Sequence, residues 1–117
     1  MHNSYISFYL KASRIHIFVD TLRGLGSPFR ICFKIDENGE KLLIMPYDRR
    51  DFKSHRVSPD VYHGDGRMQV YSIKLCRIIA DLHNWDLSSS YRVPGIVFTD
   101  KGVAVFCLKE ANMIRQV

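Results

Sequence analysis

One order of elements occurs twice along this chain, and it restricts the fold more than any single motif. Residues 29–31 (Phe-Arg-Ile) and 91–93 (Tyr-Arg-Val) each open a predicted β-hairpin that follows a strand and a helix. Counted from the aromatic residue, the return strands begin 13 and 12 positions later, at Leu42 and Val103. Half of a 117-residue chain buries little core alone. We therefore expect an α+β fold in which two pseudo-duplicated strand-helix-β-hairpin units pack into one domain with a largely antiparallel sheet.

The first unit, residues 1–46, is predicted from its hydrophobic periodicity and its turn residues. Apolar side chains alternate with polar ones in the period of two that is typical of strands. Asp20 as a capping residue and Gly26 as a C-cap delimit a short helix, and a polar turn over 36–39 closes a hairpin. The predicted elements are strands over 5–11 and 14–19, a helix over 20–25, and hairpin strands over 29–35 and 42–45.

The second unit, residues 68–110, contains the longest predicted helix, which begins after the N-cap residue Ser72. The residues at the spacing of one buried helix face are Leu75, Ile78, Ile79 and Leu82. Pro94 has no amide hydrogen, so we expect its strand at an edge of the sheet or with a bulge. The predicted elements are a strand over 68–71, a helix over 73–84, and hairpin strands over 91–98 and 103–108.

The two units are joined by residues 47–67, where the apolar pattern gives way to polar residues with Pro59, Gly64 and Gly66. Such a composition predicts a connector with at most a short strand or turn of its own. We expect residues 1–117 to form a single domain in which each unit covers the sheet of the other.

Charge and cysteine content indicate the environment of the protein. Seventeen Lys and Arg outnumber twelve Asp and Glu, and the formal charge of +5 favours polyanionic partners. Cys32, Cys76 and Cys107 stand apart in apolar stretches, so neither a disulfide framework nor a Cys-x-x-Cys site is expected. The first residues lack a signal-peptide pattern, and no run of eighteen apolar residues occurs. We expect a cytoplasmic protein without a membrane partner.

Three stretches of the first unit resemble a known family. Residues 14–19 read Arg-Ile-His-Ile-Phe-Val, residues 22–26 read Leu-Arg-Gly-Leu-Gly, and residues 41–44 read Lys-Leu-Leu-Ile after a strand and a polar turn. This order is similar to the AbrB-like swapped-hairpin DNA-binding family of bacterial transition-state regulators and antitoxins, over residues 5–46, with a fainter second copy over 70–108. The resemblance implies a homodimeric regulator of bacterial transcription that binds double-stranded DNA. The chain also looks like small bacterial proteins of unknown function.

Positive charge is consistent with that resemblance. Residues 1–35 hold five Lys and Arg against Asp20 alone, and residues 49–56 interleave Phe52 with four cations. Contacts to phosphates require cations along one surface. The residues expected to bind nucleic acid are Lys11, Arg14, Arg23, Arg30, Arg49, Arg50, Lys53 and Arg56. The alternative is that these charges only solvate strand faces and a loop that nearby carboxylates neutralise.

Catalytic motifs are not found in the sequence, because the five histidines share no ligand spacing and no serine lies in a nucleophile-elbow pattern. His63 and Asp65 share one turn, but two ligands fall short of the three that a catalytic zinc takes. We expect no enzyme activity, no cofactor and no metal site. The alternative to DNA binding is a non-enzymatic protein-interaction or scaffold domain, possibly clamp-like.

Overall fold

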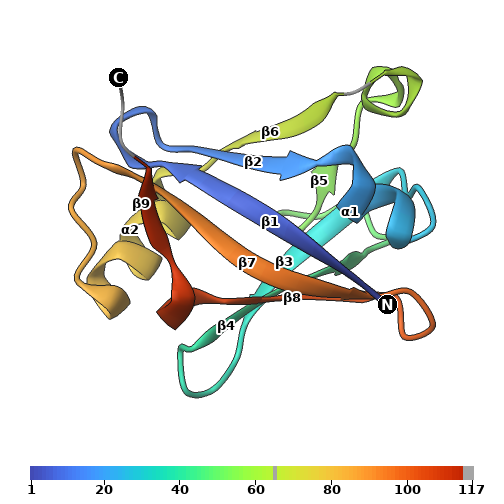
Figure 1. Cartoon of the computed structure of the whole chain (residues 1–117). Helices are drawn as coiled ribbons and strands as arrows, with labels where there is room; N and C mark the ends of the chain where they lie inside the picture. Colours follow the sequence, from blue (N-terminus) through green and yellow to red (C-terminus); the bar gives the residue numbers. More distant parts are fainter. Residues whose placement is uncertain (65, 115–117) are drawn as a thin grey trace.

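The computed structural model describes residues 1–64 and 66–114, and Figure 1 shows its strands and helices. In chain order the elements are β1 (His2–Tyr9), η1 (Leu10–Ala12), β2 (Arg14–Phe18), α1 (Val19–Gly24), β3 (Arg30–Ile35), β4 (Lys41–Pro46), β5 (His55–Arg56), η2 (Pro59–His63), β6 (Arg67–Tyr71), α2 (Ile73–His83), β7 (Ser90–Phe98), β8 (Val103–Cys107), η3 (Leu108–Glu110) and β9 (Asn112–Ile114). The strands, helices and hairpins predicted from the sequence are therefore confirmed, with ends that differ by a few residues.

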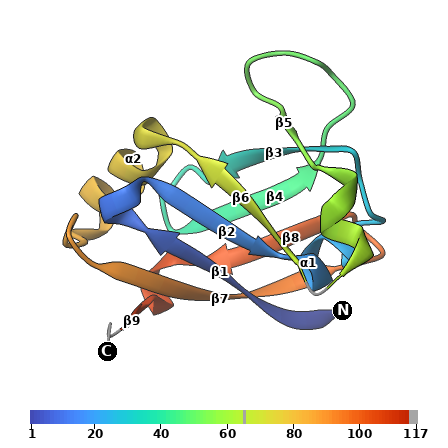
Figure 2. The same ribbon diagram turned by 90° about the horizontal axis from the view of Figure 1, so that it is seen from above.

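The strands form one antiparallel sheet in the order β5-β3-β4-β8-β7-β1-β2-β6, and β9 also pairs with β7. The sheet curls into an open barrel. Figure 2 shows β3 and β4 on the opposite side of this barrel from β1 and β7. A mostly antiparallel sheet with two α-helices confirms the predicted α+β class.

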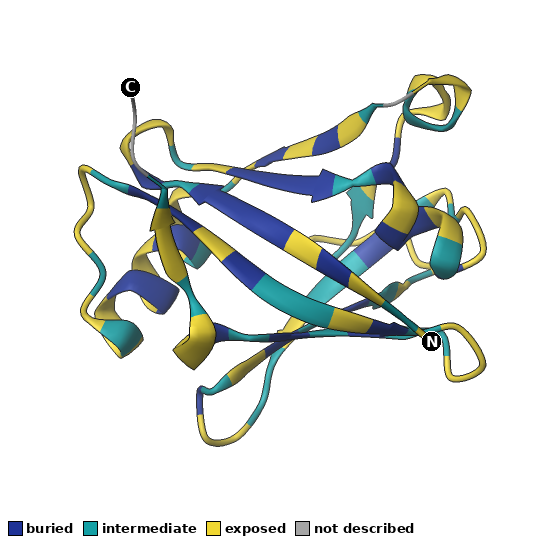
Figure 3. Ribbon diagram, in the orientation of Figure 1, coloured by how far each residue is buried: buried dark blue, intermediate teal, exposed yellow. Residues whose placement is uncertain are grey.

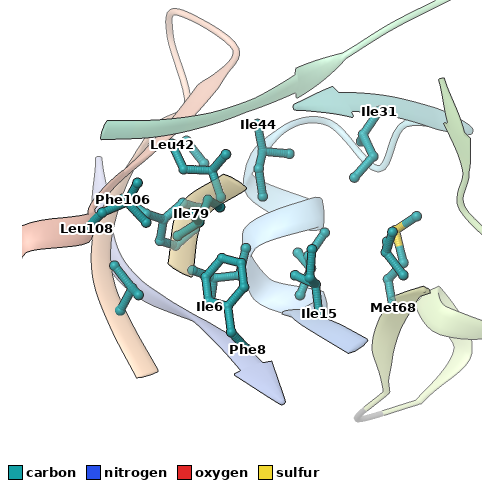
Figure 4. Packing of buried hydrophobic residues seen from close by; sticks show 14 of the residues in the cluster. Ile6, Phe8, Ile15, Ile31, Leu42, Ile44, Met68, Ile79, Phe106 and Leu108 are labelled. Atoms are coloured by element: carbon teal, nitrogen blue, oxygen red, sulfur yellow. The ribbon is translucent and has the colours of Figure 1, made fainter. Parts of the chain in front are cut away.

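Alternate side chains of the strands fill the barrel. Ile6 and Phe8 of β1 and Ile15 of β2 have no exposed surface. Ile31 of β3 and Ile44 of β4 point toward them from the other side (Figure 4). Burial of each such side chain contributes about 1.5–3 kcal/mol. Figure 3 shows the same alternation as buried and exposed bands along β6, where Met68 and Val70 are buried between exposed residues.

α1 closes one end of the barrel. Its C-terminus is capped as predicted, because Gly26 takes a left-handed φ of 89° and donates its amide to the Arg23 carbonyl at 3.0 Å. The hydroxyl groups of Ser4 and Thr21 are hydrogen-bonded to each other and join this helix to β1.

α2 covers the other end of the barrel. The Ser72 hydroxyl accepts a hydrogen bond from the Leu75 amide at 3.2 Å, as expected of an N-cap residue. The helix ends at Asn84, which has a left-handed φ of 52°. Trp85 follows and stacks on Tyr91 with a centroid distance of 4.6 Å, which fixes the return of the chain to the sheet.

The buried face of α2 differs from the prediction. Ile79 is fully buried and Leu75 is partly buried, but Ile78 and Leu82 are 40% and 53% exposed. The helix lies on the barrel through a narrower stripe that includes Cys76. The helical spacing of apolar residues also selects positions at the border of the buried stripe. The predicted buried face was therefore wrong for two of its four residues, Ile78 and Leu82.

β7 lies inside the sheet, so the expectation that Pro94 marks an edge strand is wrong. β7 pairs with β1 over its whole length on one side. On its other side, residues 90–92 pair with β9 and residues 95–98 pair with β8. Pro94 falls in the gap between these two partners, where a missing amide hydrogen is tolerated.

The connector 47–67 contains the short strand β5 and the 3-10 helix η2, in agreement with the prediction of little regular structure. The Tyr62 hydroxyl donates to the Pro28 carbonyl and attaches η2 to the segment that precedes β3. No helix in the described residues is long and apolar enough to cross a membrane.

Candidate functional site

Six of the eight residues expected to bind nucleic acid lie near the end of the barrel that carries α1 and β5. These are Arg23 in α1, Arg30 at the start of β3, and Arg49, Arg50, Lys53 and Arg56. The last four belong to residues 47–56, the segment from the end of β4 to the end of β5, which we name the basic arm. Figure 2 shows its loop standing away from the sheet. A projecting loop with three cations, followed by Arg56 in β5, is accessible to an extended polyanion.

Arg30 and Arg56 face each other directly across the β3–β5 ladder. Like charges at paired positions destabilise a sheet. The Arg30 Nη1 donates to the Ser54 hydroxyl at 3.0 Å, which holds this guanidinium at the base of the basic arm. An anion that accepts hydrogen bonds from both arginines would relieve their repulsion, and a phosphate group has the geometry to do so.

Asp51 organises the loop of the basic arm. Its carboxylate accepts hydrogen bonds from the Tyr47 hydroxyl at 2.7 Å and from the Lys53 amide at 2.9 Å. The first of these bonds is the main reason that the pKa of Asp51 lies below its usual value and the pKa of Tyr47 above its own. Asp51 is therefore ionised near neutral pH, and it offsets part of the positive charge of the arm.

Aromatic side chains accompany these cations. Phe52 is 90% exposed at the tip of the arm, where the Lys53 ammonium lies 5.8 Å from the centre of its ring. Phe29 is 78% exposed beside a hollow of about 450 Å³ that Arg30 and Arg50 also line. Exposed rings beside cations are suited to contacts with sugars and bases as well as phosphates.

Arg23 is tied to its own fold more closely than the other cations of this end. Its Nη2 donates to the Tyr62 carbonyl at 3.0 Å and reaches the Gly64 carbonyl at 3.5 Å, while Nη1 lies 4.0 Å from Asp20. These contacts attach α1 to η2, so Arg23 has a structural task in addition to any contact with a ligand.

Lys11 and Arg14 lie apart from this group. They belong to η1 and the start of β2, beside α2 at the opposite end of the barrel (Figure 2). Arg14 is on the outer side of the sheet, where it faces Tyr71 of β6. The structure thus divides the eight residues between two surfaces, a division that could not be predicted without the strand order.

Two further arginines, Arg67 of β6 and Arg92 of β7, lie on the same outer side of the sheet as Arg14. The sequence prediction missed both, because each is an isolated cation in an otherwise apolar strand. Only the pairing of strands distant in sequence brings the three together.

The structure describes only part of the turn that His63 and Asp65 share in the sequence. His63 ends η2 and is exposed, and Asp65 lies outside the described residues. Among residues 1–64 and 66–114, no three His, Cys, Asp or Glu side chains come together in a way that could hold a metal ion.

Comparisons of the chain with known protein families, curated proteins and solved structures gave no match. The function must therefore be argued from the two surfaces themselves.

The lowered pKa values of His16 and His55 predict how the stability of the protein responds to acid. Burial, followed by the positive charges of Arg67 and Arg14, holds the pKa of His16 below its usual 6.5, and burial also lowers the pKa of His55. The unfolded chain therefore binds more protons than the folded chain as the pH falls below about 6.5, and stability should decrease there. Urea unfolding between pH 7.5 and 5 measures this slope, and His16→Gln should reduce it. An equal slope in the variant would contradict the prediction.

Proposed function

We propose that the protein is a DNA-binding module that contacts the phosphates of double-stranded DNA through the basic arm and Arg30. The observation that carries this proposal is the direct pairing of Arg30 with Arg56 across the β3–β5 ladder. Two like charges at one position of a sheet are unfavourable alone, and an anionic ligand stabilises them. Non-specific affinity for DNA arises from such phosphate contacts.

The form of the arm supports the same function. Its loop projects from a rigid barrel, as binding loops on stable scaffolds do, and Asp51 holds its backbone in a defined conformation. Arg49, Arg50 and Lys53 are exposed along it and can follow the backbone of a duplex.

An AbrB-like role in bacterial transcription and a homodimeric state are part of the proposal. The order strand-helix-hairpin occurs twice, as β2-α1-β3-β4 and as β6-α2-β7-β8. β2 pairs with β6 and β4 pairs with β8, so equivalent strands of the two units are neighbours. This arrangement supports, as a prediction, a duplicated single domain over residues 1–117 with units 1–46 and 68–110.

Replacing Arg49 and Arg50 together with alanine is expected to weaken duplex binding and change its salt dependence. Each lost phosphate contact should flatten the slope of log affinity against log salt by about 0.9, or about 1.8 for the pair. The matched control is Lys74→Ala with Arg77→Ala, two exposed cations of α2 that remove the same charge. Fluorescence anisotropy with a labelled duplex at rising salt measures both slopes. Absence of binding by the parent protein at low salt, or equal slopes in the two variants, would contradict the proposal.

The scaffold alternative is favoured by a different surface. Leu43 of β4 and Val105 of β8 are paired neighbours on the outer side of the barrel and only partly buried. A hollow of about 480 Å³ beside them is lined by Val105, Ile96 and Cys107. An apolar surface of this kind suits a protein partner. Sedimentation of the parent chain, together with the duplex titration, distinguishes the two functions: binding to DNA supports the first, and self-association without DNA binding supports the second.

A further inference from the structure

The outer side of β7, β1, β2 and β6 carries arginines and aromatic rings in alternation. We name this surface the arginine–tyrosine face and define it by Tyr5, Phe18, Tyr71, Arg14, Arg67 and Arg92. The basic arm lies on a different part of the barrel (Figure 2), so the following inference does not depend on the proposed function.

The strand register arranges the face in three rows, each with one arginine. In the row nearest α2, Arg14 lies between Tyr9 of β1 and Tyr71 of β6. In the row nearest α1, Phe18 faces Arg67. Neighbouring strands are about 4.8 Å apart, and alternate residues of one strand about 6.8 Å apart. Cations and rings are therefore spaced over a continuous surface and are not gathered at one point.

The middle row crosses the face through Arg92, Ser7 and His16, which are paired neighbours on β7, β1 and β2. The Arg92 guanidinium lies 5.9 Å from the ring centres of both Tyr5 and Phe18. These cation–π contacts hold the guanidinium over the sheet, between two rings, with its remaining donors available to a ligand.

The face is accessible, and the charged residues of its strands are the three arginines. Tyr5 is 50% exposed and Tyr71 is 68% exposed, although both rings belong to well-paired strands. Strands β1, β2, β6 and β7 contain no Asp or Glu over their described ranges. Asp20, in α1, lies at the rim, where it lines a hollow with Phe18 and Tyr5. An anionic ligand on this surface meets no carboxylate within the strands.

Two buried polar atoms on the face have no hydrogen-bond partner among the described residues. They are the Ser7 hydroxyl oxygen and Nδ1 of His16. Ser7 has no exposed surface, and His16, whose ring lies 4.5 Å from that of Tyr9, is 9% exposed. An unpartnered buried polar group is costly, and a polar group of a ligand can supply the missing hydrogen bond.

We propose that the arginine–tyrosine face binds single-stranded nucleic acid, with bases stacked on Tyr5 and Tyr71 and with phosphates held by Arg14, Arg67 and Arg92. Rings on a sheet stack on any base, and interleaved cations neutralise the backbone between successive bases. A duplex cannot use these rings, because its bases are already stacked on one another. Unpaired bases are thus the chemistry that this combination of side chains fits.

The experiment uses the full chain with two labelled probes, oligo-dT and oligo-rU, each of about 12 nucleotides, which lies within the usual range of site sizes. Tyr71→Ala and Tyr5→Ala are each expected to weaken binding about 5- to 150-fold, because one stacked base contributes about 1–3 kcal/mol. Tyr71→Phe keeps the ring and should retain the parent affinity. Arg67→Ala should flatten the salt slope by about 0.7, the value for one phosphate contact on a single strand.

Two controls separate this face from the basic arm. Phe52→Ala removes an exposed ring from the arm and should leave the affinity for both single strands unchanged. Lys101→Ala removes an exposed cation from the β7–β8 turn and should leave the salt slope unchanged. A preference for oligo-rU over oligo-dT, or the reverse, identifies RNA or DNA as the ligand, and either supports the proposal.

Three results would overturn the inference. The first is that the folded parent chain binds neither oligomer at low salt. The second is that Phe52→Ala abolishes binding while Tyr71→Ala does not, which would assign single strands to the arm. The third is that Tyr71→Ala weakens binding of a matched duplex by the same factor, which would make the face a general polyanion surface without base stacking. The duplex titration of the variant with Arg49→Ala and Arg50→Ala tests only the proposed function, and its outcome does not bear on the arginine–tyrosine face.

Discussion

Replacing Gly95 with alanine is expected to destabilise the protein by about 3 kcal/mol or more, at the upper end of overpacking effects. A Cβ atom at this position would lie 2.6 Å from the Val105 carbonyl oxygen and closer still to the ring of Phe106, the residue that faces Gly95 across the β7–β8 ladder. Phe106 is fully buried, so its ring cannot move toward solvent. The added methyl group would therefore separate two central strands. Thermal unfolding measures the effect as a fall in Tm on the order of 10 °C.

Gly64 provides a matched control for this substitution. Its backbone is extended, with a φ of −161°, and no atom in the described part of the chain, apart from its two chain neighbours, lies within 4 Å of a Cβ atom built at Gly64. Gly64→Ala should change stability by about 0.5 kcal/mol or less, as is usual for surface substitutions. If Gly95→Ala were as mild as this control, β7 and β8 would not approach each other as closely as described.

Ile79→Ala is expected to cost about 2–5 kcal/mol, the range for truncation of a fully buried aliphatic side chain. Ile79 has no exposed surface and lies among the core residues of the barrel near Phe106 and Leu42 (Figure 4). Removal of its side chain leaves a cavity between α2 and the sheet that neighbouring residues can fill only in part. Urea unfolding followed by the fluorescence of Trp85, which lies just beyond the end of this helix, measures the change.

The identical substitution one residue earlier tests the orientation of the helix. Ile78 is 40% exposed, so Ile78→Ala should cost less than Ile79→Ala by about 1.5 kcal/mol or more. Equal losses in the two variants would mean that α2 lies on the barrel through the broader face that apolar spacing predicts.

Local signals in the sequence were sufficient for most of the elements. The first hairpin follows from its turn, where the Asp36 carboxylate accepts hydrogen bonds from the amides of Glu40 and Lys41 and Gly39 takes a positive φ. The ends of α2 follow from Ser72 and from the loss of apolar periodicity. Two local signals were misleading: Asp20 lies inside α1 and is not its N-cap residue, and apolar spacing made the buried face of α2 too broad.

Features that depend on distant contacts were not predictable. β1 begins at His2, well before the apolar run, because a full-length partner in β7 extends it. The position of Pro94 inside the sheet depends on where β8 ends and β9 begins. Neither the early start of β1 nor the position of Pro94 inside the sheet can be inferred from the local sequence.

The two candidate surfaces also differ in how far each could be predicted from the local sequence. The basic arm is a continuous stretch of sequence, and its cations were found by counting charges. The arginine–tyrosine face draws Tyr5, Arg14, Arg67 and Arg92 from four strands, and the sequence singled out only Arg14 as a member of a site. A β-sheet surface can be found from sequence only when the strand order and the register are known.

The position of β1 between β7 and β2 affects how the protein folds during its synthesis on the ribosome. β1 is synthesised about eighty residues before β7, whose residues 90–97 are its partners over eight positions. At about 5–20 residues per second, the open edge of β1 waits roughly 4–20 s for β7. During this interval an unpaired and largely apolar strand is exposed to other nascent chains, which is a hazard for misassembly. Slow decoding between β2 and β7 would lengthen this exposure, so rapid translation of the middle of the message favours correct folding.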